Sequence, residues 1–363
     1  MPTTSIDDLL SIETLTGLVK TFSDQADNRS CTTLFAQYAK TLLPAGESVS
    51  WDEIEYSRHL APVSGPESPH TRAKRLGTRK RGSSLATIKV YKDLPASQLF
   101  LQRAPGTNLQ DAEAILTSEL EDMGNLIGNT KEFLAANALL GLIDVDPIKV
   151  PGSDVAFKVE FGVPTLGIGG PGNDPMLSWA DPATKIRSLE LGKLKEAYKK
   201  QSGLRGEIVI TEPKVEGYLT NNADIRELAK DALGLTILNN LNGQGVNPQW
   251  ALLGGLGFRF TDGTYKPEGG AITHYFPEDH ALVLPNESRL SQILGWAEGK
   301  VFVPGGSIFA GPQGATSLVR ELRGTYAYAE VRTDPMGIRV YAGWHGLPLV
   351  LNPSAVLKFK VTP

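Results

Sequence analysis

Cysteine and long apolar runs are what this sequence of 363 residues most lacks. Its single cysteine, Cys31, excludes a disulfide framework and any zinc site built from several cysteines, and it is typical of a reducing compartment. No apolar run reaches the ~18 residues that a membrane-spanning helix needs. The N-terminal sequence MPTTSIDDLL lacks the basic start and apolar run of a secretory signal. We therefore expect a soluble intracellular protein that makes no contact with membranes.

Sequence motifs of the common enzyme classes are also missing. The chain contains no G-x-x-x-x-G-K-[ST], H-E-x-x-H or G-x-S-x-G sequence. Residues 167–172 match G-x-G-x-x-G, but a dinucleotide site needs a helix that begins inside that motif. Pro171 and Pro175 prevent such a helix, so a flexible loop is the favoured interpretation. We predict no catalytic residue, no cofactor and no enzymatic activity.

Two histidines and two acids stand close together in the sequence and invite a metal-site hypothesis. His274 and His280 flank Glu278 and Asp279. Histidines six residues apart in a proline-containing turn do not have a standard ligand spacing. A solvated loop is therefore the favoured interpretation, and we predict no metal site.

Other candidate residues are better explained by packing. Cys31 has no histidine nearby in the sequence, and free cysteines are among the most buried residue types. His345 follows Trp344 between apolar strands, which favours a hydrogen-bonded core histidine over a catalyst. Gly124 and Gly128 form a G-x-x-x-G pair on a charged, amphipathic segment, which indicates close helix packing in a soluble protein.

The formal net charge of −4, from 36 basic and 40 acidic residues, is distributed unevenly. Residues 56–92 contain nine basic residues and one acid, so this segment carries +8 and the rest carries −12. Such an asymmetry suggests a basic element that reaches an acidic or polyanionic partner. The densest part has six basic residues in ten positions without an acid: Arg72, Lys74, Arg75, Arg79, Lys80 and Arg81.

This basic run has three interpretations. A solvated loop is the simplest, although self-repulsion makes it costly. A nucleic-acid-binding arm is the second; the run lacks interleaved aromatic residues for base stacking, but phosphate contacts do not need them. The third is docking on an acidic surface of another subunit, where charge complementarity sets the orientation.

The N-terminal hundred residues predict helices followed by an extended arm. Apolar residues recur at helical spacing over 5–43, which predicts one or two short helices. Residues 48–56 and 85–91 alternate like strands, and a polar segment rich in glycine and proline joins them. Because long irregular loops are uncommon inside compact domains, we expect an extended two-stranded arm that docks on another surface.

The clearest periodic signal predicts a helix over 109–140, about 48 Å long at 1.5 Å per residue. Gly141 suits its end. Its first half carries five acids and no base: Asp111, Glu113, Glu119, Glu121 and Asp122. This acidic helix and the basic arm are complementary in charge.

The remaining sequence predicts an α/β body. Alternating or apolar runs predict strands, and Pro182 and Pro213 suit the first turns of two helices. The predicted strands lie at 155–161, 206–211, 280–285 and 325–361, the last with a turn at 334–337. The predicted helices run over 182–201 and from 213. Residues 234–270 are predicted to be irregular or to form short strands.

The order of these segments resembles the lambda-type capsid protein family of tailed bacteriophages, which has the HK97-like fold. The sequence LAPVSG at 60–65 before the basic run resembles that family's extended loop. VEFG at 159–162 followed by WADP at 179–182 resembles its VDFG and WSDP pair. LPLVLNPSA at 347–355 resembles its closing strands, and EIVITEPKV at 207–215 its central strand and helix. The resemblance covers about 49–361.

This resemblance implies an α+β, HK97-like capsid fold. Its expected parts are an N-terminal arm (1–46), an extended loop (47–100), a peripheral domain (101–164 and 323–363) with the spine helix 109–140, and an axial domain (165–322). The expected function is major capsid protein of a tailed double-stranded DNA bacteriophage, which assembles in the host cytoplasm and resides in the virion capsid.

The resemblance also implies partners. The chain would bind itself as pentamers and hexamers in an icosahedral shell, a portal protein, packaged double-stranded DNA without sequence specificity, and a decoration protein outside where one exists. Fewer than fifty residues precede the loop, so we expect scaffolding to be a separate protein. The resemblance and the charge pattern together predict that the six basic residues from Arg72 to Arg81 contact a neighbouring subunit. The contact would lie near the five acids of the helix 109–140. The alternatives are a nucleic-acid-binding protein that uses 72–81 and an α/β enzyme with an unrecognised site.

Overall fold

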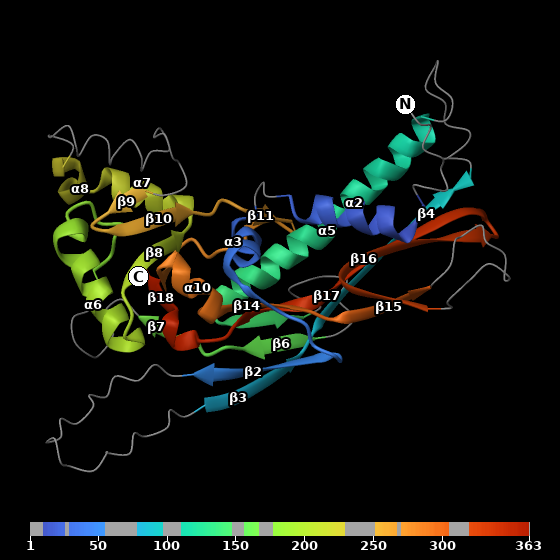
Figure 1. Ribbon diagram of the computed structural model, residues 1–363. Helices are drawn as coiled ribbons and strands as arrows, with labels where there is room; N and C mark the ends of the chain where they lie inside the picture. The colour runs from blue at the N-terminus through green and yellow to red at the C-terminus, as the bar shows by residue number, and fades with distance from the viewer. Residues whose placement is uncertain are drawn as a thin grey trace, which may run out of the picture.

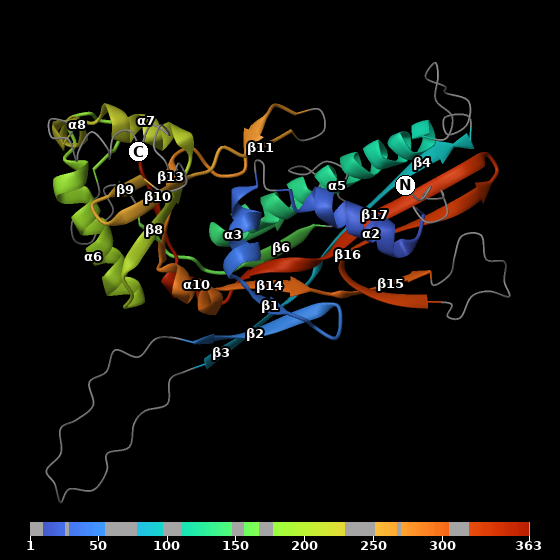
Figure 2. The same ribbon diagram turned by 45° about the horizontal axis from the view of Figure 1, so that its top comes forward.

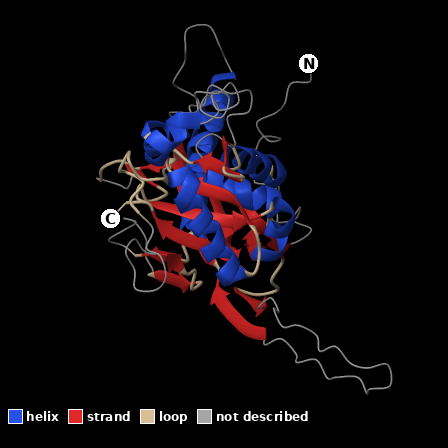
Figure 3. Ribbon diagram, turned by 90° about the vertical axis from the view of Figure 1, so that its left-hand side faces the viewer, coloured by secondary structure: helices blue, strands red, loops and turns tan. Residues whose placement is uncertain are grey.

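Two six-stranded sheets, each covered by helices, make up the described part of the computed structural model (Figure 1). The structure describes residues 10–25, 29–54, 78–96, 110–146, 156–166, 177–228, 251–266, 270–304 and 319–362. Figure 3 shows the helices packed against the strands rather than gathered in a separate helical domain. Within these ranges, none of the helices combines the length and apolar character needed to cross a membrane.

The first sheet is built around a long hairpin of β16 (Val319–Thr333) and β17 (Met336–Val350). The free edge of β17 pairs first with β4 (Ala86–Pro95) and then with β14 (Leu294–Glu298). β1 (Lys40–Leu42) runs parallel to β14, and β15 (Lys300–Pro304) pairs with β16. Segments from both ends of the chain therefore meet in this sheet.

Helix α5 (Gln110–Leu139) packs on this sheet and confirms the helix predicted over 109–140. Its buried face carries apolar side chains at helical spacing: Leu116, Leu120, Met123, Ile127 and Leu134. Gly141, with a φ of +93°, follows its end, as the sequence predicted.

Helices α2 (Ile12–Ser23) and α3 (Ser30–Tyr38) confirm the two short N-terminal helices. Ser11 caps α2 by accepting the backbone N–H of Thr14 at 3.2 Å. The described part of these residues packs in the core of its own chain, and their assignment to an arm stays a prediction. This packing is due to an apolar face on each helix, seen in Val19 and Phe35, which are at most 1% exposed.

The second sheet has the strand order β7–β18–β13–β8–β10–β9. Its strands are β7 (Thr165–Leu166), β18 (Leu357–Lys360), β13 (His280–Pro285), β8 (Gly206–Thr211), β10 (Leu256–Phe260) and β9 (Ala251–Leu253). Helices α6 (Leu191–Ser202), α7 (Pro213–Asn221) and α8 (Ala223–Leu228) accompany it. A buried aromatic group of Trp179, Phe258 and Phe359 fills its core.

The two sheets draw on interleaved parts of the chain. Strands β14 and β15 join the first sheet, whereas β18, later in the chain, joins the second. Helix α10 (Glu287–Ile293), which the sequence did not predict, leads directly into β14. The chain thus passes between the sheets several times.

The helix expected to open at Pro182 begins later. The carboxylate of Asp181 accepts the backbone N–H of Ala183 at 2.9 Å and closes a turn there. A π-helical turn (Ile186–Glu190) then leads into α6.

Three small two-stranded sheets complete the part of the chain that the structure describes. They are β2 (Ser48–Ile54) with β3 (Thr78–Ser84), β5 (Leu142–Val145) with β6 (Phe157–Glu160), and β11 (Thr264–Tyr265) with β12 (Thr273–His274). Figures 1 and 2 place the β2–β3 hairpin at the edge of the molecule.

Candidate functional site

The basic hairpin is paired differently from the sequence prediction. We expected residues 48–56 to pair with 85–91, but β2 pairs with β3, and the later segment lies in β4 of the first sheet. The cause is that residues 78–95 are almost continuously extended and change partner near the buried Leu85. Alternation in a sequence predicts a strand but does not identify its partner.

Arg81 fixes the base of this hairpin to its own chain. Its Nε lies 2.7 Å from Oε2 of Glu53, and its Nη1 donates to the carbonyl oxygen of Glu160 at 3.3 Å. Beside this pair, the buried ring of Trp51 lies 6.2 Å from that of Phe161. Arg81 therefore has a structural role within one chain, in addition to any contact between chains.

Arg79 and Lys80 differ from Arg81 because both are exposed. In the part of the chain that the structure describes, neither forms an ion pair. The other predicted basic residues, Arg72, Lys74 and Arg75, lie outside the described residues.

The acidic half of α5 is partly neutralised by its own chain. Nζ of Lys92 on β4 lies 3.0 Å from Oδ2 of Asp122 and also pairs with Glu119. Burial lowers the pKa of Lys92, but hydrogen bonds to these two carboxylates outweigh it and raise the pKa. Glu121 is exposed, which leaves it available to another molecule. Asp111 lies within α5, as does Glu113, but their side chains are not described.

The basic hairpin and the acidic half of α5 do not meet in one chain. Figures 1 and 2 show β2 and β3 below the body, while the first half of α5 lies toward the end of β4 on the opposite side. Opposite charges held apart on one subunit can attract each other between two subunits.

A buried polar network, which the sequence analysis missed, holds the N-terminal helices on α5. Nζ of Lys131 lies 3.0 Å from Oδ1 of Asp24 and 3.0 Å from Oγ of Ser23. The guanidinium of Arg29 donates to the carbonyl oxygen of Ser23 at 2.7 Å and to Oδ1 of Asn125 at 3.1 Å. Burial lowers the pKa of Lys131, and Asp24 opposes that effect.

Close approach of α2 to α5 requires small residues. A Cβ added at Gly124 would lie 2.5 Å from Cβ of Phe22, and one added at Gly128 would lie 2.2 Å from the guanidinium carbon of Arg29. The interpretation of this glycine pair as a packing motif is therefore confirmed.

The candidate nucleophile and the core histidine both lie in packed surroundings. Burial raises the pKa of the Cys31 thiol, and the nearby Glu132 adds to this, so the reactive thiolate is disfavoured. His345 is 7% exposed, and its Nδ1 lies 2.8 Å from Oγ1 of Thr87. Both residues fit the packing roles that the sequence indicated.

Comparisons with known proteins complete the description. The model of one sequence family, described as Phage major capsid protein E, matches residues 44–361. No curated protein is similar enough in sequence to match the chain. A crystal structure assigned as the capsid protein of an Escherichia coli CFT073 prophage has a TM-score of 0.57 at 14% identity, over 97% of this chain and 99% of that one. The mature capsid of bacteriophage PhiM1 has a TM-score of 0.50 at 9% identity, over 90% of this chain and 86% of that one.

Proposed function

The chain belongs to the phage major capsid protein E family, and we propose that it builds the icosahedral head of a tailed double-stranded DNA bacteriophage. The chain is a structural protein of the virion capsid with an α+β, HK97-like fold, and it self-assembles into a shell. The family match over residues 44–361 is the observation that carries the proposal.

We propose that the basic hairpin acts as a clamp between subunits. Arg79 and Lys80 are exposed on β3, and Glu121 is exposed on α5. The hairpin of one subunit would lie across the peripheral domain of the next, with these basic residues near Glu121 and the acidic first turns of α5. An exposed ion pair contributes only ~0–1 kcal/mol, but a shell repeats the contact at every equivalent interface.

The basic residues differ in the contacts that they make within their own chain. Arg81 is held by Glu53 and the backbone of Glu160, so it sets the direction of the hairpin. Lys92 similarly pairs with Glu119 and Asp122, so the proposed partner in this half of α5 is the exposed Glu121. Arg72, Lys74 and Arg75 would extend the same clamp beyond the described residues.

The proposed assembly has further partners. Pentamers and hexamers would form in the host cytoplasm around a separate scaffolding protein, with a portal protein at one vertex. Double-stranded DNA would fill the shell without sequence-specific contacts, and a decoration protein could bind outside. The expected arm, extended loop, peripheral domain and axial domain stay proposals, with the sheet memberships given above.

The test is assembly of the variant R79E/K80E, examined by negative-stain electron microscopy. We expect it to form few or misshapen shells while its circular dichroism and unfolding midpoint stay at wild-type values. The matched control is K185E/R187E, which reverses two exposed basic residues just before α6 that, like Arg79 and Lys80, form no ion pair among the described residues. Adding Glu121→Lys to R79E/K80E should restore part of the assembly. Normal shells from R79E/K80E would refute the clamp, whereas a wild-type chain that stays monomeric under all conditions would refute the capsid function itself.

The same exposed basic residues favour one alternative, nucleic-acid binding by residues 72–81. A salt titration of DNA binding by the isolated subunit distinguishes the two. Binding with sub-micromolar affinity and a steep dependence on salt would favour the alternative. The clamp predicts weak binding that R79E/K80E changes little.

A further inference from the structure

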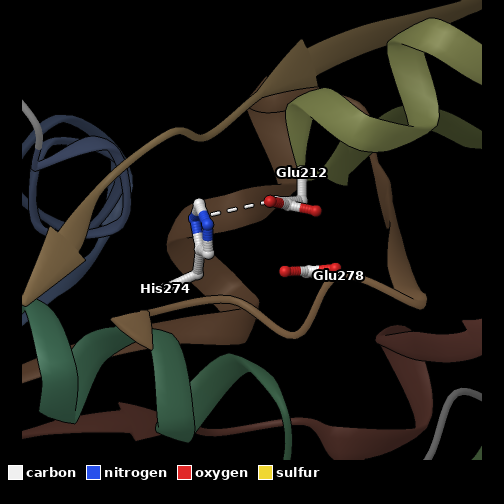
Figure 4. A group of neighbouring side chains, drawn as sticks. All are labelled: Glu212, His274 and Glu278. Atoms are coloured by element: carbon white, nitrogen blue, oxygen red, sulfur yellow. Dashed lines mark ion pairs between the residues drawn. The ribbon is translucent and has the colours of Figure 1, made fainter. Parts of the chain in front are cut away.

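A buried carboxylate, a histidine and a second carboxylate converge where the second sheet meets helix α7. They are Glu212 directly before α7, His274 on β12, and Glu278 in the turn before β13. One ligand atom from each lies within 4.8 Å of the others. Figure 4 shows the three side chains pointing into the same space. We name them the 212/274/278 cluster.

Glu212 is the unusual member of this cluster. Its side chain is 5% exposed, and its Oε2 has no hydrogen-bond partner. A buried carboxylate without a full set of partners is costly, and burial accordingly raises the pKa of Glu212, with the nearby Glu278 adding to the increase. His274 opposes this increase, with its Nδ1 3.4 Å from Oε1, and so do the charge and the backbone N–H of Lys214.

The spacing suits a metal ion better than a hydrogen bond. Ligand atoms about 2.1 Å from a tetrahedral ion stand about 3.4 Å apart, which is the separation of Nδ1 of His274 from Oε1 of Glu212. Nδ1 of His274 makes no hydrogen bond. An ion between these two atoms would give Nδ1 a partner and would offset the charge that burial makes costly.

The third ligand would be Glu278. Its Oε2 lies 2.5 Å from Nζ of Lys214, and both side chains are about half exposed. Such an exposed ion pair is weak, so Glu278 can leave Lys214 by a small side-chain movement. The exposure of this side of the cluster leaves the fourth coordination position to water.

We propose that the 212/274/278 cluster binds one divalent transition-metal ion of the Zn²⁺ class. One imidazole and two carboxylates are a mixed nitrogen and oxygen set, which suits Zn²⁺ better than Mg²⁺ or Ca²⁺. The ion would join the turn before β13 and strand β12 to the start of α7. It would thus brace the second sheet, and this role does not depend on the clamp proposed above.

This site revises the interpretation of His274 as part of a solvated loop. His280 is its neighbour in the sequence, but Nδ1 of His280 lies 2.6 Å from Oδ1 of Asp279 and outside the cluster. The missing ligand was Glu212, which lies 62 positions before His274 and comes near it only in the folded chain.

The test is isothermal titration of the untagged, EDTA-treated full-length subunit with ZnCl₂. We expect one Zn²⁺ per chain and a rise in melting temperature on binding. His274→Ala should weaken the affinity at least tenfold, and so should Glu212→Gln. His280→Ala is the matched control and should bind like the wild type.

Three results would overturn the site. They are no binding by the wild type at millimolar Zn²⁺, equal binding by the wild type and His274→Ala, or an equal loss with His280→Ala. Because Glu212 is buried, the affinity of Glu212→Gln is interpreted only if the circular dichroism of this variant matches the wild type. If it does not match, the affinity of His274→Ala decides the test, because His274 is 35% exposed. Titration of the isolated subunit does not require shells, so failure here is distinct from failure of the capsid function.

Discussion

The carboxylate of Glu132 accepts a hydrogen bond of 2.8 Å from the backbone N–H of Cys31, so the middle of α5 caps the start of α3. Its second oxygen accepts the N–H of Thr32 at 2.6 Å. Arg29, at the capping position itself, provides no side-chain hydrogen bond to the helix. A residue one hundred positions away thus does what a serine or aspartate normally does at a helix start.

Glu132→Gln should destabilise the subunit by about 1–3 kcal/mol. Replacing one oxygen by an amide nitrogen leaves a buried N–H of α3 without its acceptor. Urea unfolding of the isolated subunit measures this effect. Glu121→Gln, an exposed change on the same helix, is the control and should stay within about 0.5 kcal/mol of the wild type. Equal stability of the two variants would contradict the capping role.

Gly124→Ala and Gly17→Ala should change stability in opposite directions. A Cβ at Gly124 would lie 2.5 Å from Cβ of Phe22, so α2 must move away from α5; overpacking of this kind costs about 1–3 kcal/mol. Gly17 lies on the exposed side of α2 and has no atom within 4 Å of an added Cβ. Alanine there should stabilise the subunit by about 0.5–1 kcal/mol. Thermal unfolding of both variants checks the pair, and a stabilised Gly124→Ala would mean that the helices are not in close contact.

Arg81→Ala should loosen the hairpin, whereas Arg79→Ala should not. Removing Arg81 deprives Glu53, which is 16% exposed, of its ion-pair partner; an unsatisfied charged group of this kind costs about 1–3 kcal/mol. Limited proteolysis of the subunit should therefore cut residues 48–84 about tenfold faster in Arg81→Ala. Arg79 has no ion pair among the described residues, so its variant should be cut at the wild-type rate. Identical cleavage of both variants would assign no anchoring role to Arg81.

His345 should make the subunit less stable as the pH falls below about 6.5. Burial lowers the pKa of His345 in the folded chain. Below the unfolded pKa the unfolded chain then binds more protons than the folded chain, so stability decreases until the pH passes the folded pKa. Urea unfolding at about pH 7.5 and about pH 5.5 measures the difference. His345→Gln should reduce that pH dependence, and an unchanged difference would assign it to other groups.

Local patterns predicted the elements well where one periodicity ran without interruption. Helix α5 repeats its apolar positions over its whole length, and β8 and β13 are short apolar runs bounded by turn residues. The predicted limits of these elements agree with the structure to within one residue at each end. Periodicity is a property of neighbouring residues, which the sequence displays directly.

Which distant segments pair with each other could not be predicted in the same way. The extended residues 78–95 pair with β2 and then with β17, although both parts alternate alike. The ion pairs of Arg81 and Lys92 reach Glu53 and Glu119 across 28 and 27 positions. The charge pattern identified the hairpin and the acidic helix, but the structure was needed to find which charges are already neutralised within the subunit.

Strand β17 has a consequence for how the protein is made. It pairs with β4, β14 and β16, and β18 near the C-terminus completes the second sheet. A ribosome must therefore pass β17 before the first sheet can close and β18 before the second can, and long-range pairing of this kind is slow. A prematurely terminated chain lacks the strand at the centre of the first sheet. Such a fragment cannot present a finished surface to its neighbours, so translation itself screens the copies that enter the shell.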